Sequence, residues 1–141
     1  MGAHPRGALP APAPVACGGV RIDNLQRVDP FTTLDGSEIR EVAGPASGSA
    51  VNQSLAEATV APGGETIEHF HRTTEEIYLF THGSGRMRLG KEERDVAPGD
   101  TVVIAPGVPH KLWSTGTEPL RLLCCGAPAY SDADTVMTES R

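Results

Sequence analysis

The chain has 141 residues, a formal net charge of -6, 38% hydrophobic residues and 4% aromatic residues. This length suits one domain around a single core, and no apolar stretch approaches the length of a transmembrane helix. The negative charge and the lack of clustered cations exclude a typical nucleic-acid partner and give no sign of a membrane-surface partner.

The N-terminal segment, residues 1–19, contains four prolines together with several alanines and glycines. Such a segment cannot bury enough apolar area to order itself, so we expect a flexible arm followed by one domain over residues 20–141. The prolines also interrupt the apolar run that a secretory signal requires. Three cysteines, two of them adjacent at Cys124 and Cys125, do not suggest a disulfide framework, and we expect a cytoplasmic protein.

Short strands separated by turns are predicted along the rest of the chain. Sixteen glycines and twelve prolines imply many turns, as in a β-sandwich or barrel, and no long amphipathic helical pattern interrupts them. The predicted fold class is therefore all-β. In chain order, the strand candidates are residues 38–42, 52–60, 66–71, 76–81, 85–89, 93–96, 101–104, 110–114 and 120–125.

The third of these strands carries two histidines, His69 and His71, separated by one residue. Alternate residues of a strand point to the same face, so both imidazoles can bind one ion. A polar turn then returns the chain as the strand that contains Glu76, and His110 follows a second turn signature at residues 106–109. Imidazole and carboxylate together suit one divalent transition metal ion per chain, Fe, Zn, Mn or Ni.

The spacing of these residues resembles a known motif. Gly63, His69, His71, Glu76 and Gly83 stand at the intervals G-x5-H-x-H-x4-E-x6-G, which match the first motif of the cupin superfamily at every fixed position. The neighbouring carboxylate of Glu75 is the alternative ligand, because both faces of that strand continue with apolar residues and alternation alone does not decide between the two. The six-residue interval to Gly83 favours Glu76.

A second stretch, residues 99–110, resembles the second cupin motif and ends at His110. Ala105 replaces the usual proline and Ser114 replaces the usual asparagine, and both departures lie outside the ligand set. The resemblance covers residues 55–123 and implies a double-stranded β-helix, or jelly roll. It also implies that His69, His71, Glu76 and His110 are the metal ligands of a small single-domain cupin.

The candidate substrate pocket is apolar with a few polar groups, which suits a flat or partly apolar organic molecule with oxygen donors. Its expected members are Gln53, Ile67, Phe80, Leu112, Ser114 and Leu123. Four protein ligands on an ion that prefers six leave two positions at which such a molecule could chelate. Glu76 and Tyr78 are the candidate catalytic residues, because either side chain could carry a proton.

Two enzyme chemistries fit this site. The similarity to monocupin dioxygenases and polyketide cyclases implies oxygen-dependent cleavage with iron, or Lewis-acid isomerase, lyase or cyclase chemistry with zinc, nickel or manganese. The alternative is a non-catalytic, metal-stabilised protein that binds or senses a small molecule. The first fifty residues show no helix-turn-helix or basic cluster, which favours the enzyme. Pairing of cupins through sheet edges also implies a homodimer.

Overall fold

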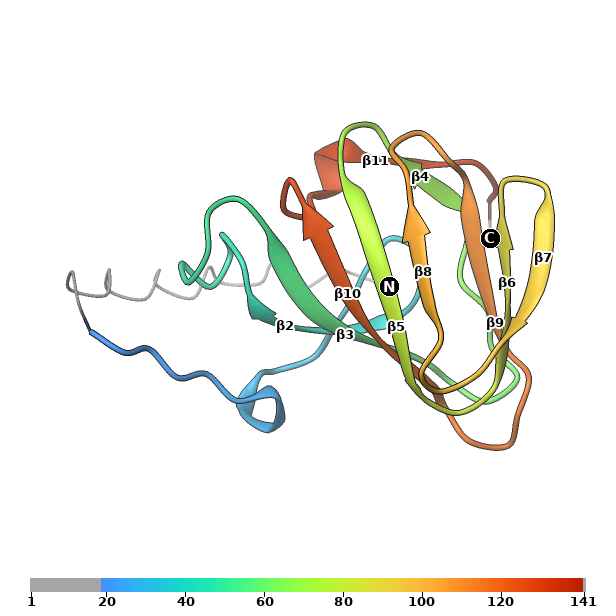
Figure 1. The fold of residues 1–141 in the computed structure, drawn as a ribbon, viewed down its shortest axis with the longest axis horizontal. Coiled ribbons are helices and arrows are strands. Elements are labelled where there is room, and N and C mark those ends of the chain that lie inside the picture. Colours follow the sequence, from blue (N-terminus) through green and yellow to red (C-terminus); the bar gives the residue numbers. More distant parts are fainter. Residues whose placement is uncertain (1–18, 141) are drawn as a thin grey trace, which may run out of the picture.

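The computed structural model describes residues 19–140, so the flexible arm expected over residues 1–19 lies outside the described residues except for Gly19. The described chain folds into two antiparallel β-sheets that close into a flattened barrel, and the predicted all-β jelly roll is confirmed (Figure 1). No helix in this part of the chain is long and apolar enough to cross a membrane.

Eleven strands and two single-turn 3-10 helices, η1 and η2, make up the described fold. The elements are η1 (Leu25–Arg27), β1 (Phe31–Thr32), β2 (Glu38–Ala43), β3 (Ser54–Val60), β4 (His69–His71), β5 (Glu75–His82), β6 (Gly85–Leu89), β7 (Glu92–Val96), β8 (Thr101–Ile104), β9 (His110–Ser114), β10 (Leu120–Ala127), η2 (Asp132–Asp134) and β11 (Thr135–Met137).

The strands form a six-stranded sheet in the order β1-β2-β3-β10-β5-β8 and a five-stranded sheet in the order β11-β4-β9-β6-β7. From β4 to β10 the chain passes repeatedly between the two sheets, which wraps it around a shared core. Phe80, Ile104, Leu120 and Leu122 are among the side chains that this core buries almost completely. The inner faces of both sheets therefore point toward one another, and functional side chains on those faces meet between the sheets.

The strands at 85–89, 101–104 and 110–114 have the predicted bounds, whereas the strand predicted over residues 66–71 begins only at His69. Thr66 explains the late start. Its backbone N–H donates to the Leu112 carbonyl at 2.9 Å, and its hydroxyl accepts the Leu112 backbone N–H at 2.9 Å. A side chain thus takes one place in the hydrogen-bond ladder, and regular pairing starts after it.

Gly83 ends β5 and allows the tight turn into β6. Its φ of +78° lies in the left-handed region, and a Cβ there would collide with the Pro119 carbonyl oxygen. Only glycine meets both conditions without strain. The last fixed position of the cupin-like motif therefore has a backbone role rather than a chemical one.

Candidate metal centre

The five-stranded sheet brings the three histidines together. His69 of β4 and His110 of β9 are direct cross-strand partners, and His71 lies two residues further along the same face of β4. All three side chains are buried. One ring nitrogen from each histidine lies within 4.8 Å of the others. The pairing of β4 with β9 and the alternation along β4 therefore bring three imidazoles together at one point.

Glu76 approaches the histidines from the other sheet, on β5. Its Oε2 atom lies 3.2 Å from His71 Nε2 and 3.4 Å from His110 Nε2, and its side chain is buried whereas Glu75 is exposed. Two ligands each about 2.1 Å from one ion, at a right angle, lie about 3.0 Å apart. The observed separations match ligands that share a metal, and such a metal would link the two sheets.

Hydrogen bonds on the outer ring nitrogens fix the orientation of two histidines. His69 Nδ1 donates to the Ile67 carbonyl at 2.8 Å, and His110 Nδ1 donates to the Val108 carbonyl at 3.0 Å. A carbonyl oxygen only accepts, so each of these neutral imidazoles carries its proton on Nδ1 and a lone pair on Nε2.

The third histidine is oriented by a hydroxyl. His71 Nδ1 lies 3.0 Å from Thr135 Oγ1, and that hydroxyl donates its own proton to the Ser131 carbonyl at 2.9 Å. Thr135 therefore accepts from His71, and the proton of a neutral His71 is also on Nδ1. All three histidines then present Nε2 lone pairs toward the interior of the site.

The candidate ligand atoms fit a metal cation, because the buried atoms that face one another are all hydrogen-bond acceptors with free lone pairs. Within residues 19–140, His71 Nε2, Glu76 Oε2 and His110 Nε2 are the buried side-chain atoms without a hydrogen-bond partner. Each such atom costs about 1–3 kcal/mol when left unsatisfied in the interior. A divalent first-row transition metal would satisfy all of them at once, because imidazole and carboxylate are ligands that these ions prefer.

The protonation states also suit metal binding. Burial alone would raise the pKa of Glu76, but the close imidazoles of His110 and His71 outweigh it and lower this pKa to about 2. Burial, followed by the neighbouring His110, lowers the pKa of His69. Near neutral pH the carboxylate is therefore ionised and His69 is neutral, as coordination requires.

The turn between β4 and β5 is held by a residue far along the chain. Asp134 accepts the Thr73 backbone N–H at 2.9 Å, the Thr73 hydroxyl at 2.8 Å and the Thr74 backbone N–H at 3.0 Å. His71 ends the strand before this turn and Glu76 lies just after it. Asp134 therefore fixes the position of two candidate ligands relative to one another, and no local sequence pattern indicated that role.

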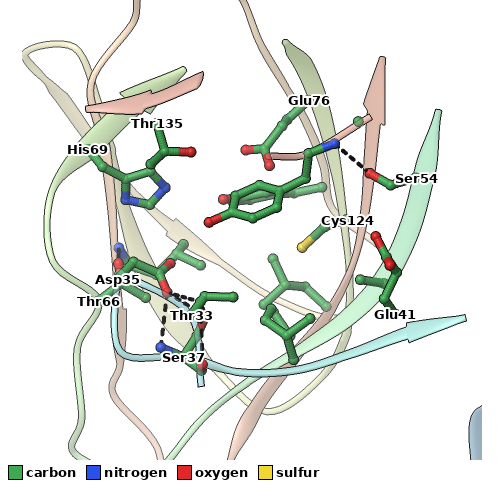
Figure 2. A pocket seen from close by; sticks show the side chains of 18 of the residues that line it. Thr33, Asp35, Ser37, Glu41, Ser54, Thr66, His69, Glu76, Cys124 and Thr135 are labelled. Carbon is green, nitrogen blue, oxygen red and sulfur yellow. Dashed lines mark hydrogen bonds between the residues drawn. The ribbon is translucent and has the colours of Figure 1, made fainter. Parts of the chain in front are cut away.

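A cavity opens beside this cluster, between the two sheets, and both His69 and Glu76 contribute to its wall (Figure 2). The register of the six-stranded sheet determines which residues face it. Small side chains in the middle of the sheet leave the space, and larger ones stand at either side. One inward-facing row crosses β2, β3, β10 and β5 and consists of Glu41, Ala56, Cys124 and Tyr78.

Leu112, one of the residues expected in the pocket, lines this cavity, and so does the candidate catalytic residue Tyr78. Phe80 instead lies in the core at 1% exposure, and Ser114 is buried with its hydroxyl 3.5 Å from the Glu118 carbonyl that accepts from it. Core packing and the local turn therefore use these two side chains, and neither lines the cavity.

The other three expected pocket residues also lie outside the cavity. Leu123 alternates with the inward-facing Leu122 and Cys124, so it points to the outer face of β10. Gln53 precedes β3 and is exposed. Ile67 is partly buried, and its carbonyl holds His69. Alternation along β10 explains the position of Leu123, whereas Gln53 and Ile67 precede the strands that were expected to contain them.

The structure adds cavity residues that the sequence pattern did not single out. Asp35 lies in the turn between β1 and β2, where its Oδ1 accepts from Thr33 Oγ1 at 2.6 Å, Ser37 Oγ at 2.7 Å and Ser37 N at 3.0 Å. Tyr130, after β10, also lines the cavity. A Thr-x-Asp-Gly-Ser turn is readable in the sequence, but its place beside the cavity depends on long-range pairing.

The Cys124 thiol faces the cavity and is neutral. Burial, reinforced by the charge of Glu76, raises its pKa well above the ordinary value. A thiolate would be needed for a nucleophile or a metal ligand. Cys124 therefore acts as a small apolar wall residue.

Comparisons with known proteins agree with this geometry. The family model of the cupin domain matches residues 56–126. The protein MJ1618 of Methanocaldococcus jannaschii is 46% identical over 113 residues, which are 80% of this chain and 90% of that protein.

Solved structures share the fold at lower sequence identity. The polyketide cyclase RemF of Streptomyces resistomycificus superimposes with a TM-score of 0.73 at 21% identity, covering 87% of this chain and 88% of that one. The Streptomyces nucleoside dehydratase Pac13 gives a TM-score of 0.70 at 14% identity, covering 86% and 92%. Two antiparallel sheets, three converging histidines and the family match over half of the sequence lead to one conclusion: the chain belongs to the cupin family.

Proposed function

We propose that this cupin is a metal-dependent enzyme that acts on a small, partly apolar organic molecule which chelates the metal through a hydroxyl and a carbonyl oxygen. The observation that carries the proposal is the set of buried acceptor atoms on His71, Glu76 and His110, none of which has a partner among the described residues. These atoms adjoin a cavity whose wall combines apolar side chains with hydroxyl and carboxylate groups. A metal site with an adjoining cavity is the arrangement that chelating substrates need.

His69, His71, His110 and Glu76 would hold the metal. When bound, a divalent ion would supply Lewis-acid polarisation of a substrate carbonyl. Burial, followed by the charge of Glu76, raises the pKa of Tyr78 well above its ordinary value. Tyr78 therefore keeps its proton and serves as a hydrogen-bond donor at the cavity wall, whereas Glu76 would accept a proton only when its carboxylate leaves the metal.

We favour isomerase, lyase or cyclase chemistry over oxygenation. The cavity wall carries two further carboxylates, Asp35 and Glu41, which are groups that bind or move protons. The fold is shared with a polyketide cyclase and a nucleoside dehydratase, both of which are named for reactions without an oxygen co-substrate. Dioxygenase activity with iron remains the second candidate because the same ligand set suits that metal.

The proposal is tested with α-hydroxyacetophenone, a flat molecule that offers adjacent hydroxyl and carbonyl oxygens. Protein loaded with zinc, nickel, manganese or iron is incubated with it in deuterated water, and α-proton exchange and oxygen consumption are recorded together. We expect metal-dependent exchange that a chelator abolishes. Oxygen uptake instead would favour the dioxygenase, and neither signal with any metal would favour the non-catalytic binding protein.

We also propose a homodimer, which an exposed apolar stripe supports. Leu55, Ile77, Leu79 and Val103 are 38%, 39%, 38% and 57% exposed. They lie on the outer face of β3, β5 and β8 in the six-stranded sheet, with β10 between β3 and β5. A second copy packed there would remove this area from water. Light scattering is expected to give twice the chain mass of 14.8 kDa, and V103E to give one chain mass with unchanged metal content. A single-chain mass for the unaltered protein would contradict the proposal.

A further inference from the structure

Glu41 contributes a carboxylate to the wall of the cavity. It lies on β2, whereas Glu76 lies on β5, on the other side of β3 and β10 in the six-stranded sheet. It points inward from β2, in the row that continues through Ala56 and Cys124 to Tyr78. Figure 2 shows Glu41 and His69 on different sides of the same cavity, with the Cys124 thiol between them. The other inward side chain of this part of β2, Ile39, is apolar.

No structural role accounts for this carboxylate. Among residues 19–140 it has no hydrogen-bond or ion-pair partner. The Asp35 carboxylate on the same cavity differs, because its Oδ1 atom receives three hydrogen bonds that hold the β1–β2 turn. Burial raises the pKa of Glu41, so the protein pays a desolvation cost at this position without an internal partner to offset it.

The backbone around Glu41 makes room for its side chain. The pairing of β2 with β3 shifts register between Glu41 and Ala43, which is a β-bulge. A Cβ on Gly44 would lie 2.7 Å from Glu41 Oε1, so the carboxylate occupies space that a side chain at residue 44 would take. Bulges often re-aim side chains next to functional sites.

The span between the two ends of the row suits a ring-sized molecule. Glu41 and Tyr78 are three strand spacings apart, which places their Cα atoms about 14 Å apart along the sheet. Both side chains reach into the cavity and shorten this gap, and Ala56 and Cys124 between them are small. A molecule with one aromatic ring that is bound by its oxygen atoms at the metal would therefore extend toward Glu41.

We propose that Glu41 is a specificity-determining residue that accepts a hydrogen bond from an ammonium or hydroxyl group at the end of the substrate remote from the metal. The inference rests on the proposed function, because the metal fixes the other end of the substrate. A half-buried carboxylate without an internal partner discriminates between ligands, since it accepts a hydrogen bond from a donor and repels an anion. The net charge of -6 further favours a cationic ligand.

The test uses three α-hydroxyacetophenones that differ only at the para position, which carries an aminomethyl, a methyl or a carboxyl group. Their binding to zinc-loaded protein is measured by calorimetry, after a titration of zinc alone. We expect the aminomethyl compound to bind about tenfold more tightly than the methyl compound, and the carboxyl compound most weakly. In E41Q this preference should fall to about threefold or less, with zinc binding unchanged.

Two further variants separate the effect of charge from the effect of the position of the carboxylate. Glu38→Gln removes the same charge from an exposed, outward position on the same strand and should keep the full preference. Gly44→Ala keeps the charge but displaces the carboxylate and should reduce the preference. Three outcomes would overturn the role of Glu41 alone, provided that both proteins bind zinc. The preference for the aminomethyl compound could be equal in E41Q and the unaltered protein, it could be absent from both, or neither protein could bind any of the three probes. Failure to bind zinc, nickel, manganese or iron overturns the proposed function and this inference with it.

Discussion

Replacing Glu76 with glutamine is expected to stabilise the metal-free protein at about pH 8 by about 1–3 kcal/mol, and to weaken divalent metal binding about 100-fold or more. Without a metal, Glu76 Oε2 faces the lone pairs of His71 Nε2 at 3.2 Å and His110 Nε2 at 3.4 Å, and all three atoms are acceptors. The glutamine amide adds N–H donors at this place. With a metal, the same change removes a charged ligand.

The difference between E76Q and the wild type should grow in acid. The pKa of Glu76 falls from 4.5 to about 2 on folding, so the stabilising contribution of its ionised form is complete above about pH 4.5 and disappears as the pH falls toward 2. The glutamine does not titrate, so metal-free wild-type protein should lose stability relative to E76Q between about pH 4.5 and about pH 2.

Chemical denaturation of chelator-treated protein at about pH 8 and at about pH 3 measures this change in stability, and zinc titration measures the affinity. Glu75→Gln is the matched control, because Glu75 is the exposed neighbour on the same strand and should change neither quantity. Equal stability of E76Q and wild type at both pH values, together with unchanged zinc affinity, would show that Glu76 does not face the histidine lone pairs as described.

The His69→Ala, His71→Ala double variant should lose the stabilisation that added metal gives to the wild-type protein. A metal that binds only the folded state contributes about 4 kcal/mol at a thousand times its Kd, which for a domain of this size raises the Tm by about 10 °C or more. The variant retains only His110 and Glu76 near the site. Its Tm should therefore move by only about 2 °C or less when zinc is added.

Thermal unfolding with and without zinc provides the measurement, and circular dichroism confirms that the double variant folds. His82→Ala serves as the control, since His82 lies on β5 but is exposed and hydrogen-bonded to Thr81. The control should keep the full metal-dependent shift. An equal shift in the double variant would place the stabilising ion elsewhere.

Local patterns were enough to predict an all-β fold and most of its strands, and the resemblance to the cupin motifs implied the jelly roll. The strands at 85–89, 101–104 and 110–114 are bounded by turns with glycine or proline, so the sequence alone predicts where they end. The strand over residues 135–137 was not predicted because three residues carry too short an alternation. Its existence depends on pairing with β4, more than sixty residues earlier in the chain.

The four candidate metal ligands could be named from the sequence, because strand alternation places two of them on one face and the spacing of the cupin-like motifs indicates all four. The cavity could not be predicted, because its shape depends on which inward rows contain small residues. Ala56 and Cys124 become neighbours only through the pairing of β3 with β10. Glu41 likewise reads as an ordinary surface residue of an edge segment until the register of β2 on β3 turns it inward. The shape of the cavity and the inward orientation of Glu41 therefore depend on the pairing of strands that are far apart in the sequence.

The most direct test of the account is the metal content of the wild-type protein, purified without added metal or chelator and measured by elemental analysis beside the His69→Ala, His71→Ala variant. We expect close to one divalent first-row transition metal ion per chain in the wild type and almost none in the variant, because the buried lone pairs of His71, His110 and Glu76 need a cation. Metal-free wild-type protein that also fails to take up zinc, nickel, manganese or iron when these are added would contradict the central claim.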